Sequence, residues 1–274
     1  MAQQEDTENQ YASVDRGDNR PISDLRSQLS TRQIISRQII NLAQSNFTLM
    51  LSAIMEDYLK AIYYLQDETD ERVRTSTLAE HMDVAQPSVT SMVKKLAERD
   101  FVHYEPYKGV VLTDTGIPVA LEIIRHHRLL ERYLTERLEY DWAEVHDEAD
   151  RLEHHISNQF ADRIAEQLGN PAVDPHGDPI PTADLDVSPL QSGETLADQQ
   201  VGDKVRIERV PDNDPDLLRY LSEHEITPTT VVEIVETTSF GMVTLDPDGT
   251  DERVALPEEV ARSISAQTLA GSSN

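Results

Sequence analysis

The sequence contains no cysteine among its 274 residues. Disulfides, thiolate zinc sites and iron–sulfur clusters are excluded, because all of them need cysteine sulfur. The chain also lacks any apolar run near the ~20 residues that a membrane helix needs. Its polar N-terminus has no apolar signal-peptide core. These absences predict a cytoplasmic protein without a membrane partner.

Lysine is scarce, whereas acidic residues are abundant. Acidic residues outnumber basic ones by 51 to 24, the net charge is −27, and the lysines are Lys60, Lys94, Lys95, Lys108 and Lys204. Such a composition is typical of proteins in concentrated salt, which screens charge repulsion beyond roughly 3 Å. We therefore predict a salt-loving host cell, a halophilic archaeon. The negative charge then argues little against a nucleic-acid partner.

Hydrophobic periodicity and turn residues divide the chain into five segments. Residues 1–48 are expected to be a disordered or partly helical extension, with Met50 and Met55 as alternative starts. Residues 49–114 and 115–168 have helical patterns, and residues 169–199, rich in Pro, Asp and Ser, predict a linker. Short strands over residues 200–264 predict a small SH3-like barrel. The expected fold is mainly α with a C-terminal all-β module.

Residues 49–114 outline a winged helix-turn-helix. An amphipathic helix with Ile54 and Tyr58 on its apolar stripe precedes a short helix after Arg74 and a third helix with Pro87 in its first turn. Two β-branched runs joined by a Pro-Tyr-Lys-Gly turn then predict a hairpin. The third helix offers short and cationic side chains to a major groove, and Lys108 offers a phosphate contact at the wing. The alternative is an ordinary small α/β domain.

Histidine and carboxylate side chains recur at helical-turn spacing in residues 115–168. His127 and Glu131 are four residues apart, and a second helix has one stripe with His146, Asp150, Glu153 and His154. Such groups can chelate Mn²⁺, Fe²⁺ or Zn²⁺, and Asp57 could complete the set. In so acidic a chain the alternative is salt-bridged helix faces. His126 and His155, off the stripe, are expected to be surface or packing residues.

Several motifs in a fixed order resemble the diphtheria toxin repressor family of iron- and manganese-dependent regulators. They are MEDYLKAIYYL, RVRTSTLAEHMDVAQPSVTSMVKKLAERDFVHYEPYKGVVLT, RHHRLLERYL, VHDEADRLEHHIS and PHGDPIP. The resemblance covers residues 55–181 closely and extends through the C-terminal domain. It implies that residues 115–168 form a metal-binding and dimerisation domain, and that the C-terminal domain is of the iron-transport-protein-A type.

The resemblance implies two metal sites. An ancillary site would use His127, Glu131 and His146, with a shell completed by Glu208 and Asp212. The primary, activating site would use Asp57, Asp150, Glu153 and His154. Iron-type members have methionine and cysteine where this chain has Asp57 and Asp150, so ligand hardness favours Mn²⁺ slightly over Fe²⁺. The manganese branch has a glutamate where this chain has Lys60, so a binuclear manganese site is not implied.

The resemblance also implies a switch and a DNA contact surface. A metal joining Asp57 to the other primary ligands would fix the angle between the two halves of the chain, so that a homodimer reads a palindromic operator. Ala85, Pro87 and Ser91 would occupy base-reading positions. The phosphate-contact candidates would be Thr75, Ser76, Ser88, Thr90 and Lys94. The expected function is metal-dependent repression of metal-uptake genes.

Two other classes of function remain open from the sequence. A metalloenzyme would use the same ligand types, but the chain has no HExxH motif and no evident general base outside the ligand set. In a winged-helix regulator that does not respond to metal, the histidine and carboxylate cluster would be only a salt-adapted surface. Turnover of a substrate with Mn²⁺ would support the first class. Operator binding without metal would support the second.

Overall fold

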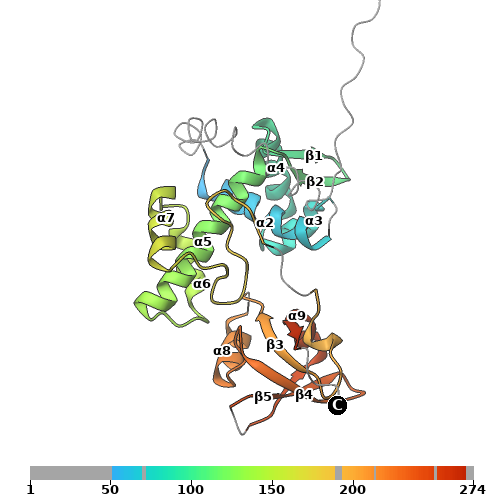
Figure 1. Cartoon of the computed structure of the whole chain (residues 1–274). Coiled ribbons are helices and arrows are strands. Elements are labelled where there is room, and N and C mark those ends of the chain that lie inside the picture. The colour runs from blue at the N-terminus through green and yellow to red at the C-terminus, as the bar shows by residue number, and fades with distance from the viewer. Residues whose placement is uncertain (1–50, 70–71, 189–192, 213, 250–251, 270–274) are drawn as a thin grey trace, which may run out of the picture.

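A computed structural model describes residues 51–69, 72–188, 193–212, 214–249 and 252–269 (Figure 1). The predicted extension over residues 1–48, with the alternative start at Met50, lies outside these ranges. None of the described helices is long and apolar enough to cross a membrane.

The N-terminal part of the structure is a helix-turn-helix with a two-stranded wing. Its elements are α2 (Ala53–Thr69), α3 (Thr75–His81), α4 (Gln86–Glu98), β1 (Val102–Glu105) and β2 (Gly109–Leu112). The antiparallel strands pair Val102 with Leu112. Gly109 has φ +116°, and a Cβ there would lie 2.4 Å from the Val73 carbonyl oxygen. Glycine therefore lets the wing approach the segment before α3.

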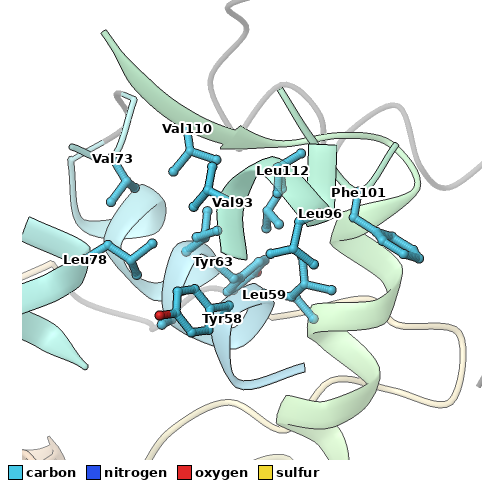
Figure 2. Close-up of a cluster of buried hydrophobic side chains, with 14 of the residues drawn as sticks. Tyr58, Leu59, Tyr63, Val73, Leu78, Val93, Leu96, Phe101, Val110 and Leu112 are labelled. Atoms are coloured by element: carbon cyan, nitrogen blue, oxygen red, sulfur yellow. The ribbon is translucent and has the colours of Figure 1, made fainter. Parts of the chain in front are cut away.

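The N-terminal elements share one hydrophobic core. Leu59 of α2, Leu78 of α3 and Leu96 of α4 are fully buried and converge beneath the wing (Figure 2). Val89 and Val93 of α4, four residues apart, are buried in the same core. Ile54 differs from the prediction, because it lies in the first turn of α2 and is 58% exposed.

The middle part is built on the long helix α5 (Gly116–Leu138). It packs against α2 on one side and against α6 (Val145–Leu152) and α7 (Asn158–Gln167) on the other (Figure 1). Ser157 caps α7 by accepting a hydrogen bond from the Phe160 N–H. The second core of the chain forms here around Leu129, Val145 and Ile164.

The C-terminal part is a five-stranded antiparallel sheet in the order β6-β5-β4-β3-β7. The strands are β3 (Lys204–Arg209), β4 (Val231–Thr237), β5 (Met242–Pro247), β6 (Val254–Pro257) and β7 (Ser265–Thr268). Helices α8 (Pro215–Glu223) and α9 (Glu258–Ser263) and the 3₁₀ turn η1 (Leu196–Asp198) accompany the sheet. Alternating buried residues of the strands form its core, which Ala143 of the α5–α6 connection joins.

The predicted linker over residues 169–199 is partly a packed segment. Arg125 and Arg128 of α5 donate hydrogen bonds to the carbonyl oxygens of Pro181 and Pro179, and Ile180 is buried. Within this segment, Val173 and Pro179 pair in an isolated antiparallel bridge. The segment can therefore pack without being helical, because arginines of α5 satisfy these carbonyl groups.

Candidate metal centre and DNA-contact surface

Asp57, Glu153 and His154, hereafter the bridging set, connect the N-terminal and middle parts of the chain. Asp57 comes from α2, whereas Glu153 and His154 follow the end of α6. His154 Nε2 lies 2.8 Å from Asp57 Oδ1 and 3.4 Å from Glu153 Oε1. The ligand atoms of all three residues lie within 4.8 Å of one another. The fold thus brings together predicted ligands about a hundred residues apart.

Carboxylates hold the imidazole of His154 from both edges. Its Nδ1 donates to Glu56 Oε2 at 2.6 Å, while Nε2 donates to Asp57. Burial disfavours the charged ring, but hydrogen bonds to Asp57 and Glu56 outweigh that cost and raise the pKa of His154 to about 9. Glu56 was absent from the predicted site, although it is adjacent to Asp57 in sequence.

His127, His146 and Asp150, hereafter the central set, form a second cluster between α5 and α6. His127 Nδ1 lies 3.2 Å from Asp150 Oδ1. Glu131 Oε1 accepts hydrogen bonds from His127 Nε2 at 3.0 Å and His146 Nδ1 at 3.1 Å. The predicted ancillary residues His127, Glu131 and His146 therefore meet. Asp150 was predicted with the Asp57 group but lies with these histidines instead.

Lys60 explains where Asp150 lies. Its ammonium donates to Asp150 Oδ1 at 2.9 Å and to the two carboxylate oxygens of Glu153 at 2.8 and 2.9 Å. The lysine therefore contacts both the bridging and the central sets, which also meet directly where His127 Nδ1 lies 2.6 Å from Glu153 Oε2. Burial disfavours its charge, but Glu153 and Asp150 outweigh that effect and raise the pKa of Lys60.

Burial and neighbouring charges act in opposite directions inside the central set. Burial disfavours a charged His127, but the charge of Glu131 raises the pKa of His127 well above its ordinary value. Burial likewise disfavours the Glu131 carboxylate, but His127 holds the pKa of Glu131 well below its usual range. These opposite shifts favour a protonated His127 beside an ionised Glu131.

Glu131, Asp174 and His176, hereafter the buried set, form a third cluster. All three are at most 1% exposed. Among the described residues, Glu131 Oε2, Asp174 Oδ2 and His176 Nδ1 have no hydrogen-bond partner. The ligand atoms of the set lie within 4.8 Å of one another. Burial raises the pKa of Asp174 well above its ordinary value, with the charges of Asp178 and Glu131 adding to the effect.

The sequence prediction missed Asp174 and His176 because they lie in the expected linker. The available signal was the motif PHGDPIP, which places one histidine and one aspartate between prolines, with Asp174 immediately before it. Gly177, with φ +96°, makes the placement possible, since a Cβ there would lie 2.0 Å from the Glu208 carbonyl oxygen. The ring of His176 stacks on Trp142 with centroids 5.3 Å apart, and its Nε2 donates to the Trp142 carbonyl oxygen at 2.9 Å.

The C-terminal part approaches the central set through one predicted ligand. Asp212 Oδ2 lies 4.0 Å from His146 Nδ1 and belongs to a group with Glu131 and His146 whose ligand atoms are within 4.8 Å. Glu208, the other residue predicted from this part, is in none of the metal-compatible groups found among the described residues.

The donor types of these clusters suit a divalent transition metal. Imidazole nitrogens combine with carboxylate oxygens, and no sulfur is present, which fits Mn²⁺, Fe²⁺ or Zn²⁺. Unpartnered polar atoms in the interior are costly, and three converge in the buried set. A cation there would satisfy them, so the residues present fit a bound ion.

The predicted DNA-contact residues lie on α3, α4 and the wing. Ala85 precedes α4, where Pro87, Ser88 and Ser91 are exposed, and Gln86 Nε2 links α4 to the Thr75 hydroxyl at 3.3 Å. The remaining candidates on these helices are Ser76, Thr90 and Lys94. Thr90 donates its hydroxyl to the Gln86 carbonyl oxygen, which reduces its freedom to contact phosphate.

The wing lysine Lys108, expected to contact phosphate, is held in an ion pair. Lys108 Nζ lies 2.7 Å from Glu105 Oε2, and Arg72 pairs with the same carboxylate at 2.8 Å. A phosphate contact by Lys108 would have to displace Glu105. Tyr107, which the sequence analysis did not select, is fully exposed at the tip.

Family models match all three parts of the chain. The model "Iron dependent repressor, N-terminal DNA binding domain" matches residues 50–110, and "Iron dependent repressor, metal binding and dimerisation domain" matches residues 113–182. The FeoA domain model matches residues 194–267. The predicted fold class is thereby confirmed.

Curated relatives and solved structures agree with these matches. The iron-dependent repressor IdeR of Mycobacterium tuberculosis is 32% identical over 226 residues, which cover 78% of this chain and 96% of the relative. The diphtheria toxin repressor of Corynebacterium efficiens is 30% identical over 226 residues, covering 79% and 96%. A manganese-dependent transcriptional repressor in complex with manganese has a TM-score of 0.72 at 37% identity, covering 78% of this chain and all of that chain.

The chain therefore belongs to the diphtheria toxin repressor family. The family includes iron- and manganese-dependent repressors. The resemblance drawn from the sequence motifs is confirmed, while the halophilic host stays a prediction.

Proposed function

We propose that the chain is a metal-dependent transcriptional repressor that binds operator DNA as a homodimer when loaded with Mn²⁺ or Fe²⁺. The observation that carries the proposal is the bridging set, which takes Asp57 from the helix-turn-helix and Glu153 and His154 from the middle part. A cation bound to all three favours the arrangement in which both parts contribute ligands. That differential binding is what a ligand-driven switch requires.

The proposed activating site is the bridging set, with Asp150 adjacent across Lys60. The proposed second site combines His127 and His146 of the central set with the buried set, to which Glu131 belongs, and with Asp212 from the C-terminal part. Glu208 is assigned to this site by the family resemblance alone. The ion would supply positive charge that removes repulsion among clustered carboxylates.

The ligand chemistry favours manganese slightly. Asp57 and Asp150 are hard oxygen ligands, and hard ligands suit Mn²⁺, although carboxylates also bind Fe²⁺. The relatives include proteins of both kinds: IdeR is an iron-dependent repressor, and two of the similar structures are a manganese-dependent repressor and the manganese regulator SloR. We propose that the physiological ion is Mn²⁺ or Fe²⁺. We also propose that the repressed genes are genes of metal uptake.

The DNA contact follows from the helix-turn-helix. In a two-fold dimer the α4 helices would face successive major grooves of a palindromic operator, about one helical turn apart. Ala85, Pro87 and Ser91 are short, so base recognition would rely on apolar contacts and on DNA shape. Phosphate contacts are assigned to Thr75, Ser76, Ser88, Thr90, Lys94 and Lys108.

Operator binding by chelator-treated protein tests the proposal. The full chain is titrated anaerobically in molar KCl with Mn²⁺, Fe²⁺ and Zn²⁺ in turn, with genomic fragments selected by the protein as probe. Binding that requires Mn²⁺ or Fe²⁺ is expected. Equal binding with and without metal would overturn the metal switch and leave a DNA-binding protein.

One observation favours that second candidate, a winged-helix regulator that ignores metal. Lys60 joins α2 to Asp150 and Glu153, and Glu56 joins α2 to His154, without any ion. These contacts could hold the helix-turn-helix against the middle part permanently. The same titration separates the two candidates. Catalysis has no such support, because the relatives are transcriptional repressors.

A further inference from the structure

Glu56 is a carboxylate beside the bridging set that the metal-binding proposal leaves without a role. It lies on α2 next to Asp57, and its side chain is only 8% exposed, against 41% for Asp57. Its Oε2 is 2.6 Å from His154 Nδ1, a short contact for a nitrogen donor and a carboxylate. A buried charge of this kind needs a partner, and His154 supplies one.

The two nitrogens of His154 face different carboxylates. Nδ1 faces Glu56, whereas Nε2 faces Asp57 at 2.8 Å and Glu153 at 3.4 Å. Ionised carboxylates only accept hydrogen bonds, and a neutral imidazole carries one proton. If that proton stays on Nδ1, the lone pair of Nε2 points toward the other two members of the bridging set.

We propose that Glu56 is a positioning residue for the metal site, holding the proton of His154 on Nδ1 so that Nε2 is the ligand atom. This proposal rests on the proposed function, since it requires that the bridging set binds an ion. Glu56 itself is not a ligand. It meets the edge of the ring opposite the cluster, and the metal-compatible group comprises Asp57, Glu153 and His154 without it.

The physical effect of such a partner is on ring orientation and ligand basicity. When a histidine binds a metal through one ring nitrogen, a carboxylate that accepts the N–H of the other nitrogen fixes the tautomer. Loss of that carboxylate typically weakens metal binding by about 10- to 100-fold. Glu56 also sits on the same helix as Asp57, so one turn of α2 supplies both a ligand and the group that orients the opposing ligand.

The test measures Zn²⁺ binding to the full chain, since Zn²⁺ is diamagnetic and allows nuclear magnetic resonance. In the Zn²⁺-loaded wild type, long-range ¹H–¹⁵N correlations are expected to show His154 protonated at Nδ1 and metal-bound at Nε2. Glu56→Ala is expected to lower Zn²⁺ affinity by about 10- to 100-fold with the number of bound ions unchanged at saturation. Glu56→Gln should lose less, because its amide oxygen still accepts the Nδ1 proton.

Two further variants make the outcome specific. Asp57→Ala should lose one ion per chain, and Glu80→Ala, which removes an exposed carboxylate of α3, should change nothing. Thermal unfolding of each metal-free variant checks that it folds. Unchanged affinity in Glu56→Ala, a lost ion in that variant, or a wild-type His154 bound through Nδ1 would each overturn the positioning role. Failure of the wild type to bind Zn²⁺, Mn²⁺ or Fe²⁺ would instead overturn the proposed function.

Discussion

The bridging set and the buried set use the same kinds of ligand atom but connect different parts of the chain. The bridging set connects the helix-turn-helix to the end of α6, and its Asp57 side chain is 41% exposed. The buried set connects α5 to the packed segment after α7, and its members are at most 1% exposed. Ligand type therefore does not determine the effect of an ion. An ion between the helix-turn-helix and the middle part can change their arrangement, whereas an ion enclosed in the buried set acts first on stability.

Removing a bridging ligand should have the largest effect. Asp57→Ala is expected to abolish metal-activated operator binding, a loss of roughly a thousandfold, comparable with the gap between specific and non-specific binding. The fold should survive, because the Asp57 side chain is partly exposed. Fluorescence anisotropy with labelled operator measures the loss, and circular dichroism checks the fold. Glu153→Ala is expected to lose metal-activated operator binding to a similar extent. Normal metal-dependent binding by both variants would mean that the activating site lies elsewhere.

Removing the shared carboxylate of the interior should act on stability first. Glu131→Ala leaves the buried His127 and the partly exposed His146 without their common acceptor. Breaking such a buried pair typically costs about 3 kcal/mol, and we expect the free energy of unfolding of the metal-free protein to fall by that amount. Urea denaturation measures it, with Asp57→Ala as the matched comparison at less than about 1 kcal/mol. Equal losses in the two variants would erase the distinction between the sets.

The pH dependence of metal binding should be a smaller, graded effect. The pKa of His154 is about 9 in the metal-free protein, so an ion at Nε2 must displace a proton below that pH. Affinity at the bridging set should rise about tenfold per pH unit toward pH 9 and then level off. The raised pKa also means that the stabilisation from the charged ring, complete below its ordinary pKa, is lost as pH rises through 9.

Free Mn²⁺, followed by electron paramagnetic resonance between pH 6.5 and 9, measures this dependence. His154→Ala lacks this ligand, so the part of the pH dependence of Mn²⁺ affinity that comes from the bridging set should disappear. Only the part that comes from the central and buried sets should remain. A slope that is the same in wild type and His154→Ala would assign the pH dependence to the central and buried sets.

Local patterns predicted the helices and their inward faces well. Val89, Val93 and Leu96 are buried at the spacing expected for one helix face, and Ser157 caps its helix. Asp141 and Glu144 have the sequence spacing of a capping box, but α6 begins at Val145, and Asp141 Oδ1 accepts from the Ala143 N–H instead. End effects of this kind depend on contacts outside the helix, here the packing of Ala143 into the C-terminal core.

The candidate site was predictable where ligands share a helix and less so where they do not. His127 and Glu131 meet because they are one turn apart, and His154 meets Asp57 where the family resemblance places it. The grouping of Asp150 depends on Lys60 reaching across from α2. Asp174 and His176 depend on arginines of α5 binding an irregular segment. No periodicity in the sequence encodes such tertiary contacts.

The chain has a single tryptophan, and it is the residue stacked on His176. Indole emission is quenched by open-shell ions at short range, so Mn²⁺ or Fe²⁺ entering the buried set would dim the intrinsic fluorescence of the unlabelled protein. Because Trp142 also contacts the core of the C-terminal part, a change in how that part is seated would alter the same signal. The molecule thus carries its own optical probe at the junction of its middle and C-terminal parts.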